Sequence, residues 1–334
     1  MKKIMIFVNG EGRGHLTQAL GFKEIVERNG YIIIGCFLGT TNNKKIPDYF
    51  NELNCPIYPF ESPQFVKIDN KGISISKTIL NTLKNTRRYI ASIKNIKQIV
   101  KTNNPDIITN FYEPLFGLFN ITNKIPSISI GHQYYLELNK FDIPNSIDKY
   151  LLFLNNKLSS LNSQIWCLSF TDDISYYKII PPILRNTKSL IPSNSEGCLA
   201  YICNEGYINE LDNTGLEILC YMKTDNTYTQ NNMVVTPLSE NFIDDLKRCE
   251  HYISTSGFES ICEAYYLGKN IHVVPIDNHF EQLCNSLDSE RLGIAKRYEQ
   301  YSDISLDTKI VDNTEFKIWV DSAESKIIEL LNTI

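Results

Sequence analysis

Short apolar runs alternate with longer amphipathic stretches over most of the chain. The first run, Ile4–Val8, ends in a polar loop, and the segment after that loop has the pattern of a helix to about Arg28. Further apolar runs occupy 31–38, 55–60, the segments PDIITNFYEP and IPSISIGHQYY, and 164–170. Near-continuous apolar runs are typical of parallel strands that are covered on both faces. The pattern therefore predicts an α/β domain with a parallel sheet.

The alternation is interrupted between residues 178 and 197. This stretch contains three prolines and has neither helical nor strand periodicity, which indicates a linker, placed at 181–196. From Gly197 the alternation starts again, with strands expected at 198–203, 216–221 and 233–236 and a helix at 239–249. Because 334 residues are many for one core, we predict two α/β domains, residues 1–180 and 197–313.

Composition narrows the class of protein. The formal net charge is -5 without a long run of like charges, so nucleic acid is not an expected partner. Nine scattered cysteines without a C-x-x-C pair indicate reduced thiols and a cytoplasmic protein. The apolar run at the amino terminus stops after five residues, as expected for a first strand and not for an export signal.

A long basic helix is expected at residues 74–101. Its apolar positions keep helical spacing and comprise Ile79, Leu83, Ile90, Ile93 and Val100, whereas most of its lysines and arginines lie elsewhere on the helix. Such a helix could lie on an anionic membrane, hold a charged acceptor, or simply expose a solvated face. A peripheral position at the inner face of the membrane is thus an open alternative to a purely cytoplasmic one.

The first loop carries Gly10, Gly12, Gly14 and His15. A dinucleotide fingerprint would need glycine at position 15 and an acidic residue after the next strand, and this sequence has neither, which disfavours a nicotinamide enzyme. What the loop presents is an imidazole at a helix start, where the positive end of the helix lowers the pKa of His15 and favours the proton-accepting form. His15 is therefore a candidate general base. The alternative is that the glycines only form a tight turn beside an exposed histidine.

Polar residues also follow two other strands of the first domain. Glu113 ends one segment, and His132 with Gln133 ends the next. The carboxyl ends of parallel strands meet at one edge of a sheet, which is where ligands bind in this architecture. We expect these groups to converge with His15, with Glu113 orienting His15 or binding an acceptor hydroxyl. Each of them could instead cap the helix that follows.

The most informative part of the second domain is the segment 251–286. Ser256-Gly257-Phe258-Glu259 has the form of a capping box, and Gly257 permits close approach to a helix amino terminus that attracts phosphate. Glu263 lies one turn beyond Glu259, so the two can share a face. A following helix contains Glu281, Gln282 and Asn285. For Glu259 we favour a capping role, and for Glu263 and Gln282 a functional one.

With these motifs in place, the chain resembles the GT-B glycosyltransferases, within them the family 28 and UDP-glycosyltransferase-like group. The resemblance rests on the amino-terminal G-x-G-H loop, on S-G-x(5)-E-A-x(3)-G with a later V-P, and on E-Q-x-x-N. It implies two Rossmann-like, doubly wound parallel-sheet domains that face a cleft. It also implies that segment 314–334, with its helically spaced apolar residues, is a helix returning to the first domain.

The resemblance also implies roles for individual residues. The second domain would bind a nucleotide sugar, with UDP-sugar the favoured donor. Glu263 would bind the ribose hydroxyls, Ser256 and Gly257 the diphosphate, and Glu281 with Gln282 the sugar. The acceptor would be a glycan, a lipid or a small molecule, held near Gly12, Gly14, His132 and Gln133. Asn204-Glu205-Gly206 stands where such enzymes usually carry a loop richer in glycine or serine.

The reaction expected from this reading is an inverting sugar transfer. No D-x-D triplet and no metal-ligand spacing occurs in the sequence, so neither a metal nor another cofactor is expected. His15 would deprotonate the acceptor hydroxyl, and helix-end N–H groups would stabilise the departing diphosphate. Two alternatives remain open at this point, a nucleotide-sugar epimerase of the same architecture and a non-catalytic protein that binds nucleotide sugars.

Overall fold

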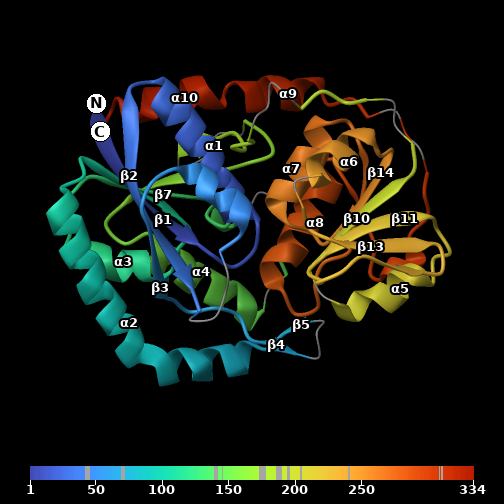
Figure 1. The fold of residues 1–334 in the computed structure, drawn as a ribbon, viewed down its shortest axis with the longest axis horizontal. Helices are drawn as coiled ribbons and strands as arrows, with labels where there is room; N and C mark the ends of the chain where they lie inside the picture. The colour runs from blue at the N-terminus through green and yellow to red at the C-terminus, as the bar shows by residue number, and fades with distance from the viewer. Residues whose placement is uncertain are drawn as a thin grey trace. The chain divides into compact units, whose positions relative to one another are not determined.

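The computed structural model divides the chain into two compact units. It describes residues 1–41, 46–68, 72–138, 142–144, 146–172, 178–185, 190–193, 196–203, 205–239, 241–307, 309 and 311–334. Unit 1 comprises Met1–Val66, Ile75–Arg185 and Ile318–Ile334, and unit 2 comprises Lys67–Ser74 and Asn186–Lys317. Each unit is built on its own sheet (Figure 1).

The described residues of unit 1 form a seven-stranded, wholly parallel sheet in the order β3-β2-β1-β6-β7-β8-β9. Its strands are β1 (Lys2–Asn9), β2 (Tyr31–Thr40), β3 (Ile57–Glu61), β6 (Ile107–Phe111), β7 (Ser127–Gly131), β8 (Gln164–Leu168) and β9 (Lys178–Ile180). Residues of β6 and β7 are buried throughout, as the apolar runs predict. The order reverses between β1 and β6, as in a doubly wound sheet.

Helices cover both faces of this sheet. They are α1 (Gly14–Arg28), α2 (Ile75–Asn103), α3 (Leu115–Asn120), α4 (Ile147–Ser159) and α10 (Ala323–Leu331), with short turns η1 (Asp48–Leu53) and η2 (Tyr135–Leu138). Met5 and Phe7 of β1 belong to a core with residues of α2 and α3. Phe22 of α1 instead stacks edge-on against Phe111, whose ring centroid lies 5.5 Å away.

Unit 2 has a sheet of the same kind, in the order β12-β13-β11-β10-β14-β15-β16 among the described residues. Within this sheet, β12 pairs antiparallel with β13, and the other pairs of described strands are parallel. The strands are β10 (Cys198–Ile202), β11 (Ile218–Met222), β12 (Tyr228–Gln230), β13 (Met233–Pro237), β14 (His251–Ser254), β15 (Asn270–Val273) and β16 (Lys296–Arg297). The helices are α5 (Ile208–Asp212), α6 (Phe242–Arg248), α7 (Phe258–Tyr266) and α8 (Phe280–Arg291), with turns η4 (Glu205–Tyr207) and η5 (Tyr301–Asp303). Helix α9 (Thr314–Asp321) begins in unit 2, and its residues from Ile318 belong to unit 1. The two sheets together give the α/β architecture that the apolar runs predict.

Two features of the fold were not expected from the periodicity. Residues 178–180, which show no strand pattern in the sequence, form β9 at the edge of the unit 1 sheet and end where the expected linker, 181–196, begins. A hairpin of β4 (Lys67–Ile68) and β5 (Gly72–Ile73) belongs to unit 2 although it is surrounded in sequence by unit 1. The Ile73 amide donates a hydrogen bond of 3.3 Å to the Asp277 carbonyl oxygen. This contact joins residues that are far apart in the sequence, and local periodicity carries no signal of it.

The carboxyl-terminal segment forms two helices, whereas the sequence pattern predicts one. Helix α9 ends at Asp321 and α10 starts at Ala323. The Ser322 hydroxyl donates to the Trp319 carbonyl oxygen at 2.6 Å, a side-chain bond that competes with regular helix continuation. Within unit 1, the Trp319 indole N–H donates to the Ser169 carbonyl oxygen at 3.0 Å. The Arg28 guanidinium pairs with the Glu324 carboxylate at 2.8 Å.

Burial divides the apolar stripe of α2 into two parts. Ile79, Leu83 and Ile90 are exposed at 46%, 67% and 51%. Val100 of the same stripe is buried, together with Ile96. The first half of α2 thus keeps its apolar residues in solvent because no other described element covers them. Among the described residues, no helix combines the length and the apolar character that crossing a membrane requires.

Candidate active site

The candidate residues of unit 1 lie where the strand order reverses. Val8 of β1 is in register with Phe111 of β6, and Phe111 is in register with Ile130 of β7. The loops after these three strands therefore leave the same edge of the sheet. In open α/β sheets, ligands bind at this carboxyl edge beside the reversal of strand order.

The glycine loop after β1 has structural requirements of its own. The Gly10 amide donates to the Gly39 carbonyl oxygen at 2.8 Å, and a Cβ at position 10 would lie 2.4 Å from that oxygen. Gly12 has a φ of 96°, which disfavours other residues, and the space around it is open. Gly14 is the first residue of α1. The loop thus places His15 in the first turn of α1, as the sequence predicts.

His15 is held by a neighbour in its own helix and by an aromatic ring. Its Nδ1 lies 3.4 Å from Gln18 Oε1, and its ring stacks on Tyr112 with centroids 5.8 Å apart and an interplanar angle of 25°. Since Gln18 Oε1 only accepts, Nδ1 carries the proton and Nε2 keeps a lone pair. Burial lowers the pKa of His15 to about 4, against a smaller raising effect of the Gln18 bond. Desolvation, and not chiefly the helix end, favours the neutral form.

Tyr112 is a residue that the sequence did not single out. It is buried in the left-handed backbone conformation, with a φ of 54°, which is uncommon for a bulky side chain. Its hydroxyl donates to Asn156 Oδ1 at 2.6 Å, and Asn156 Nδ2 donates to the Gln133 carbonyl oxygen at 2.8 Å. Tyr112 therefore links His15 to the segment after β7. No local pattern predicts a positive φ at a tyrosine.

Glu113 does not orient His15, contrary to that part of the prediction. Its carboxyl group is fully buried, and its Oε1 accepts hydrogen bonds from the Ser62 hydroxyl at 2.5 Å and from the Leu115 amide at 3.0 Å. Desolvation raises the pKa of Glu113 to about 8, although both hydrogen bonds oppose the shift. The group is thus protonated at neutral pH, and it acts locally as the cap of the turn before α3.

His132 and Gln133 lie at the same edge, after β7, and both are buried. His132 Nδ1 lies 2.8 Å from the Leu168 carbonyl oxygen, which assigns the proton to Nδ1. The imidazole stacks on Tyr135, with centroids 5.6 Å apart and 20° between the rings. Burial lowers the pKa of His132 to about 4. Because its ring is packed and hydrogen-bonded in this way, His132 is fixed in position and is a poor candidate for the general base.

In unit 2, the strand order reverses between β10 and β14, and the candidate donor residues follow β14. The predicted capping box does not form, because the N-cap of α7 is Gly257, which has no side chain to make a cap hydrogen bond. The Ser256 hydroxyl donates instead to the Gln282 carbonyl oxygen at 2.7 Å, and Asn285 Nδ2 donates to the Ser256 carbonyl oxygen at 3.0 Å. These two bonds hold the loop against α8. A helix that starts after a glycine N-cap suits an anionic ligand, because a ligand can approach its amino terminus closely.

The remaining donor candidates lie on α7 and α8. Glu259 and Glu263 are both buried on α7, one turn apart. Gln282 Oε1 accepts from the Ile276 amide at 3.0 Å, and Glu281 precedes it in the first turn of α8. His279, which the sequence reading passed over, is the N-cap of α8 and accepts a bond of 3.4 Å from the Gln282 amide. Asn204 lies outside the described residues, and Glu205 begins the turn η4.

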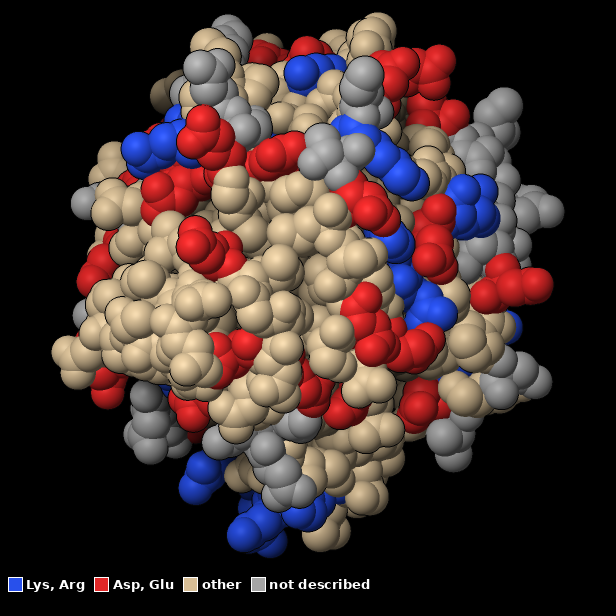
Figure 2. Space-filling model, turned by 90° about the vertical axis from the view of Figure 1, so that its right-hand side faces the viewer, with Lys and Arg blue, Asp and Glu red and all other residues tan. Residues whose placement is uncertain are grey.

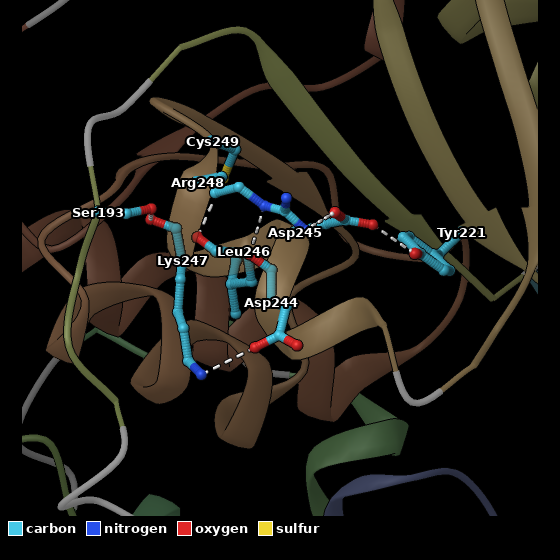
Figure 3. Close-up of polar contacts among 8 residues, drawn as sticks. All are labelled: Ser193, Tyr221, Asp244, Asp245, Leu246, Lys247, Arg248 and Cys249. Carbon is cyan, nitrogen blue, oxygen red and sulfur yellow. Dashed lines mark hydrogen bonds and ion pairs between the residues drawn. The ribbon is translucent and has the colours of Figure 1, made fainter.

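A separate hollow of about 650 Å³ opens at the other edge of the unit 2 sheet, beside the first residues of β10 and β11. Asp245 and Arg248 of α6 line it and form an ion pair of 3.0 Å, and Asp245 also accepts from the Tyr221 hydroxyl at 2.6 Å (Figure 3). The Asp245 and Arg248 side chains at this hollow thus already pair with each other. Because the hollow lies at the amino ends of the strands, we do not assign the active site to it.

Solved glycosyltransferases share this architecture over their whole length. SsfS6 from Streptomyces sp. SF2575, complexed with thymidine diphosphate, is 10% identical with a TM-score of 0.65, and all of each chain is covered. MurG from Acinetobacter baumannii is 13% identical with a TM-score of 0.59 and the same full coverage. UGT89C1 from Arabidopsis thaliana, complexed with UDP, is 11% identical with a TM-score of 0.60, covering 100% of this chain and 94% of its own.

The fold is therefore that of the GT-B glycosyltransferases, with one parallel Rossmann-like sheet in each unit. The sequence profile described as "Glycosyl transferase family 1" matches residues 2–313. The chain belongs to this glycosyltransferase family. No curated protein matches the sequence significantly.

Proposed function

We propose that this glycosyltransferase transfers a sugar from a nucleotide-sugar donor, a UDP-sugar in the first instance, to an acceptor hydroxyl with inversion. The observation that carries the proposal is the position of His15. It lies at the carboxyl edge of the unit 1 sheet, neutral through burial, with Nδ1 directed to Gln18 and Nε2 left as the proton acceptor. This is the state that a general base requires.

The proposed step is a single displacement. The acceptor hydroxyl gives its proton to His15 Nε2, and its oxygen forms a bond to the anomeric carbon of the sugar. The bond from that carbon to the diphosphate oxygen breaks, and the nucleoside diphosphate leaves with the electron pair. Attack from the side opposite the leaving group inverts the anomeric centre. The imidazolium then returns its proton to solvent.

Unit 2 is proposed to hold the donor. The uncapped first turn of α7, which starts after Gly257, would bind the diphosphate through its N–H groups and dipole. Glu263 would accept hydrogen bonds from the ribose hydroxyls, and Glu281 with Gln282 would contact the sugar. The positive end of α7 would also stabilise the charge that develops on the leaving diphosphate. No step of this scheme uses a metal ion.

Two of the similar solved structures support a nucleoside diphosphate as the donor moiety. SsfS6 is complexed with thymidine diphosphate, and UGT89C1 is complexed with UDP. Membership in a glycosyltransferase family does not favour the two alternatives, an epimerase and a non-catalytic sensor. An epimerase would also need carboxylates for acid and base work. Glu113, the buried carboxyl group at this edge, has its pKa raised to about 8 and bonds to Ser62 and Leu115.

A panel of nucleotide sugars tests the donor assignment. The purified chain is heated with UDP-, dTDP- and GDP-sugars, and a donor at 100 times its dissociation constant should add about 2.7 kcal/mol to the free energy of unfolding. Release of the nucleoside diphosphate, with the anomeric configuration of the product read by NMR, tests the transfer. No stabilisation by any of them would refute the donor proposal. An isomerised nucleotide sugar formed without acceptor would select the epimerase.

A further inference from the structure

Helix α2 of unit 1 has an unusual distribution of charge. Its 29 residues include seven lysines and arginines and no aspartate or glutamate, in a chain with a formal net charge of -5. The seven are Lys77, Lys84, Arg87, Arg88, Lys94, Lys97 and Lys101, and all are exposed. By contrast, acidic and basic side chains are interspersed on the face of the molecule drawn in Figure 2. The exposed surface of α2 is thus strongly cationic, in contrast to the net charge of the protein.

The same helix exposes large apolar side chains. Leu80 and Leu83 are 69% and 67% exposed, and Ile79 and Ile90 are about half exposed. Ile79, Leu80 and Leu83 lie on the amino-terminal half of α2 and Ile90 lies next to its midpoint, and the helix follows the outside of unit 1 (cyan in Figure 1). Single exposed leucines are common, but four large apolar residues close together on a helix are a patch. The buried residues of this helix are Tyr89, Ile96 and Val100, which pack in the core of unit 1.

A small hollow lies beside the other half of the helix. It has a volume of about 230 Å³ and is lined in part by Lys97 and Lys101 of α2, by Thr122 and Asn123, and by the Phe119 ring. The two ammonium groups and the Thr122 hydroxyl could bind a phosphate, whereas the Asn123 side-chain amide already bonds to Asn120, Ile125 and Ser127. Cationic, polar and apolar groups therefore adjoin along a single helix.

We propose that the α2 surface docks on an anionic lipid bilayer. Leucine and isoleucine side chains enter the boundary between headgroups and acyl chains, while lysines and arginines pair with anionic headgroups. Charge complementarity identifies the partner as anionic, and the apolar half of the helix favours a bilayer over a soluble polyanion, which gains nothing from leucine contacts. The inference rests on α2 alone and does not depend on the transfer reaction.

Vesicle flotation tests the proposal with the full-length protein. The chain should float with vesicles of phosphatidylcholine and phosphatidylglycerol, and not with vesicles of phosphatidylcholine alone. Arg87→Glu with Arg88→Glu should lower the partition coefficient by roughly tenfold or more, whereas Arg87→Lys with Arg88→Lys should preserve it. Lys223→Glu with Lys309→Glu is the charge control, because both residues are exposed and lie outside α2.

A matched pair tests the apolar contribution. Leu83 and Ile318 are both 67% exposed, but only Leu83 lies on α2, so Leu83→Ser should weaken vesicle binding and Ile318→Ser should not. Unfolding temperatures are measured for each variant to show that the fold is kept. Equal binding of wild type and α2 variants, or no binding to anionic vesicles, would overturn the proposal. Binding to polyphosphate that Leu83→Ser leaves unchanged, without vesicle binding, would identify a soluble polyanion instead.

Discussion

His15 and Tyr112 show how the chemistry at this edge depends on single side chains. The imidazole is placed by the glycine loop in the first turn of α1, and its ring rests on Tyr112. Tyr112 is in turn held by Asn156 at 2.6 Å. An unusual backbone conformation at a buried tyrosine costs free energy, and it persists here because packing and a hydrogen bond fix the ring.

The first prediction concerns His15. His15→Ala should reduce turnover by about a hundredfold or more, the usual contribution of a positioned base. Donor affinity should hardly change, since the proposed donor residues are in unit 2. In the wild type, the rate should fall as the pH drops through the pKa of His15, about 4, because protonation removes the lone pair of Nε2. Steady-state kinetics and titration calorimetry measure both quantities.

A different result would reassign the loop. If His15→Ala lost donor binding while turnover at saturation was preserved, the glycine loop would hold the diphosphate and the base would lie elsewhere. Glu113 is a poor replacement as base, because burial raises its pKa to about 8 and keeps it protonated at neutral pH.

The second prediction compares two glutamates on α7. Glu263→Gln should weaken UDP-sugar binding by about 1 to 2 kcal/mol, roughly tenfold, because a charge-assisted hydrogen bond to the ribose becomes a neutral one. Glu259 is the matched comparison, since it is equally buried one turn earlier on the same helix, and Glu259→Gln should not weaken the affinity because its carboxylate lies in the turn proposed to bind the diphosphate. Calorimetric titration of each variant with a UDP-sugar measures the two affinities. An unaltered affinity of Glu263→Gln would return Glu263 to a structural role.

At the scale of elements, the contact of the β6–α3 turn with β2 shapes the candidate site. A Cβ added at Gly39, near the end of β2, would lie 1.8 Å from Glu113 Oε2 and 2.6 Å from its Cδ. The Glu113 carboxyl group has little freedom to move, because it is buried and bonded to Ser62 and Leu115. Gly39 is therefore required so that the turn carrying Tyr112 and Glu113 can approach β2.

The third prediction tests this contact. Gly39→Ala should lower the free energy of unfolding by about 1 to 3 kcal/mol through overpacking. Gly257→Ala is the control, because its φ is -72° and its nearest neighbour would be 3.5 Å away, so it should fold as the wild type does. Combining Gly39→Ala with Glu113→Ala should cost less than the sum of the single changes, since one partner of the clash is gone. Additive losses in urea denaturation would show that the two residues do not compete for space.

At the scale of the whole molecule, buried titratable groups determine how stability varies with pH. Burial lowers the pKa values of His132 and His272 to about 4, so the fold holds both neutral while the unfolded chain protonates them near 6.5. Their contribution is therefore lost as the pH falls from 6.5 to 4. Glu113 acts in the opposite direction. Its pKa is raised from 4.5 to about 8, so its contribution is lost as the pH rises through that range.

The fourth prediction isolates the Glu113 contribution. Between pH 6.5 and 8, the free energy of unfolding of the wild type should fall relative to that of Glu113→Gln, which cannot ionise. The difference between the two proteins is the relevant quantity, since other titrations cancel in it. Urea denaturation at both pH values measures it. Parallel pH profiles would mean that Glu113 is already ionised in the folded protein.

The fifth prediction concerns metal ions and applies to the reaction as a whole. The sequence has no D-x-D triplet, and the proposed scheme leaves stabilisation of the diphosphate to helix-end N–H groups. Turnover should therefore survive treatment with EDTA. Loss of activity that magnesium or manganese restores would reveal a metal site and contradict the scheme.

The sequence by itself determined the elements and their order. Continuous apolar runs predict buried parallel strands, and the glycine loop after the first strand predicts His15 at a helix start, because these features depend on neighbours along the chain. Since parallel strands point the same way, the pattern also indicates that polar residues after β1, β6 and β7 share an edge. The GT-B fold follows from the same motifs through their resemblance to known enzymes.

Only the tertiary structure decided how those residues behave. Tyr112 beneath His15, the neutral carboxyl group of Glu113 against Gly39, and the hairpin of β4 and β5 in unit 2 all depend on contacts between residues distant in sequence. The pKa shifts caused by desolvation also depend on such long-range contacts, because the pKa of a side chain depends on every group packed around it. The exposed apolar half of α2 has a related cause. Periodicity identifies an apolar stripe, but it does not tell whether another part of the fold covers it.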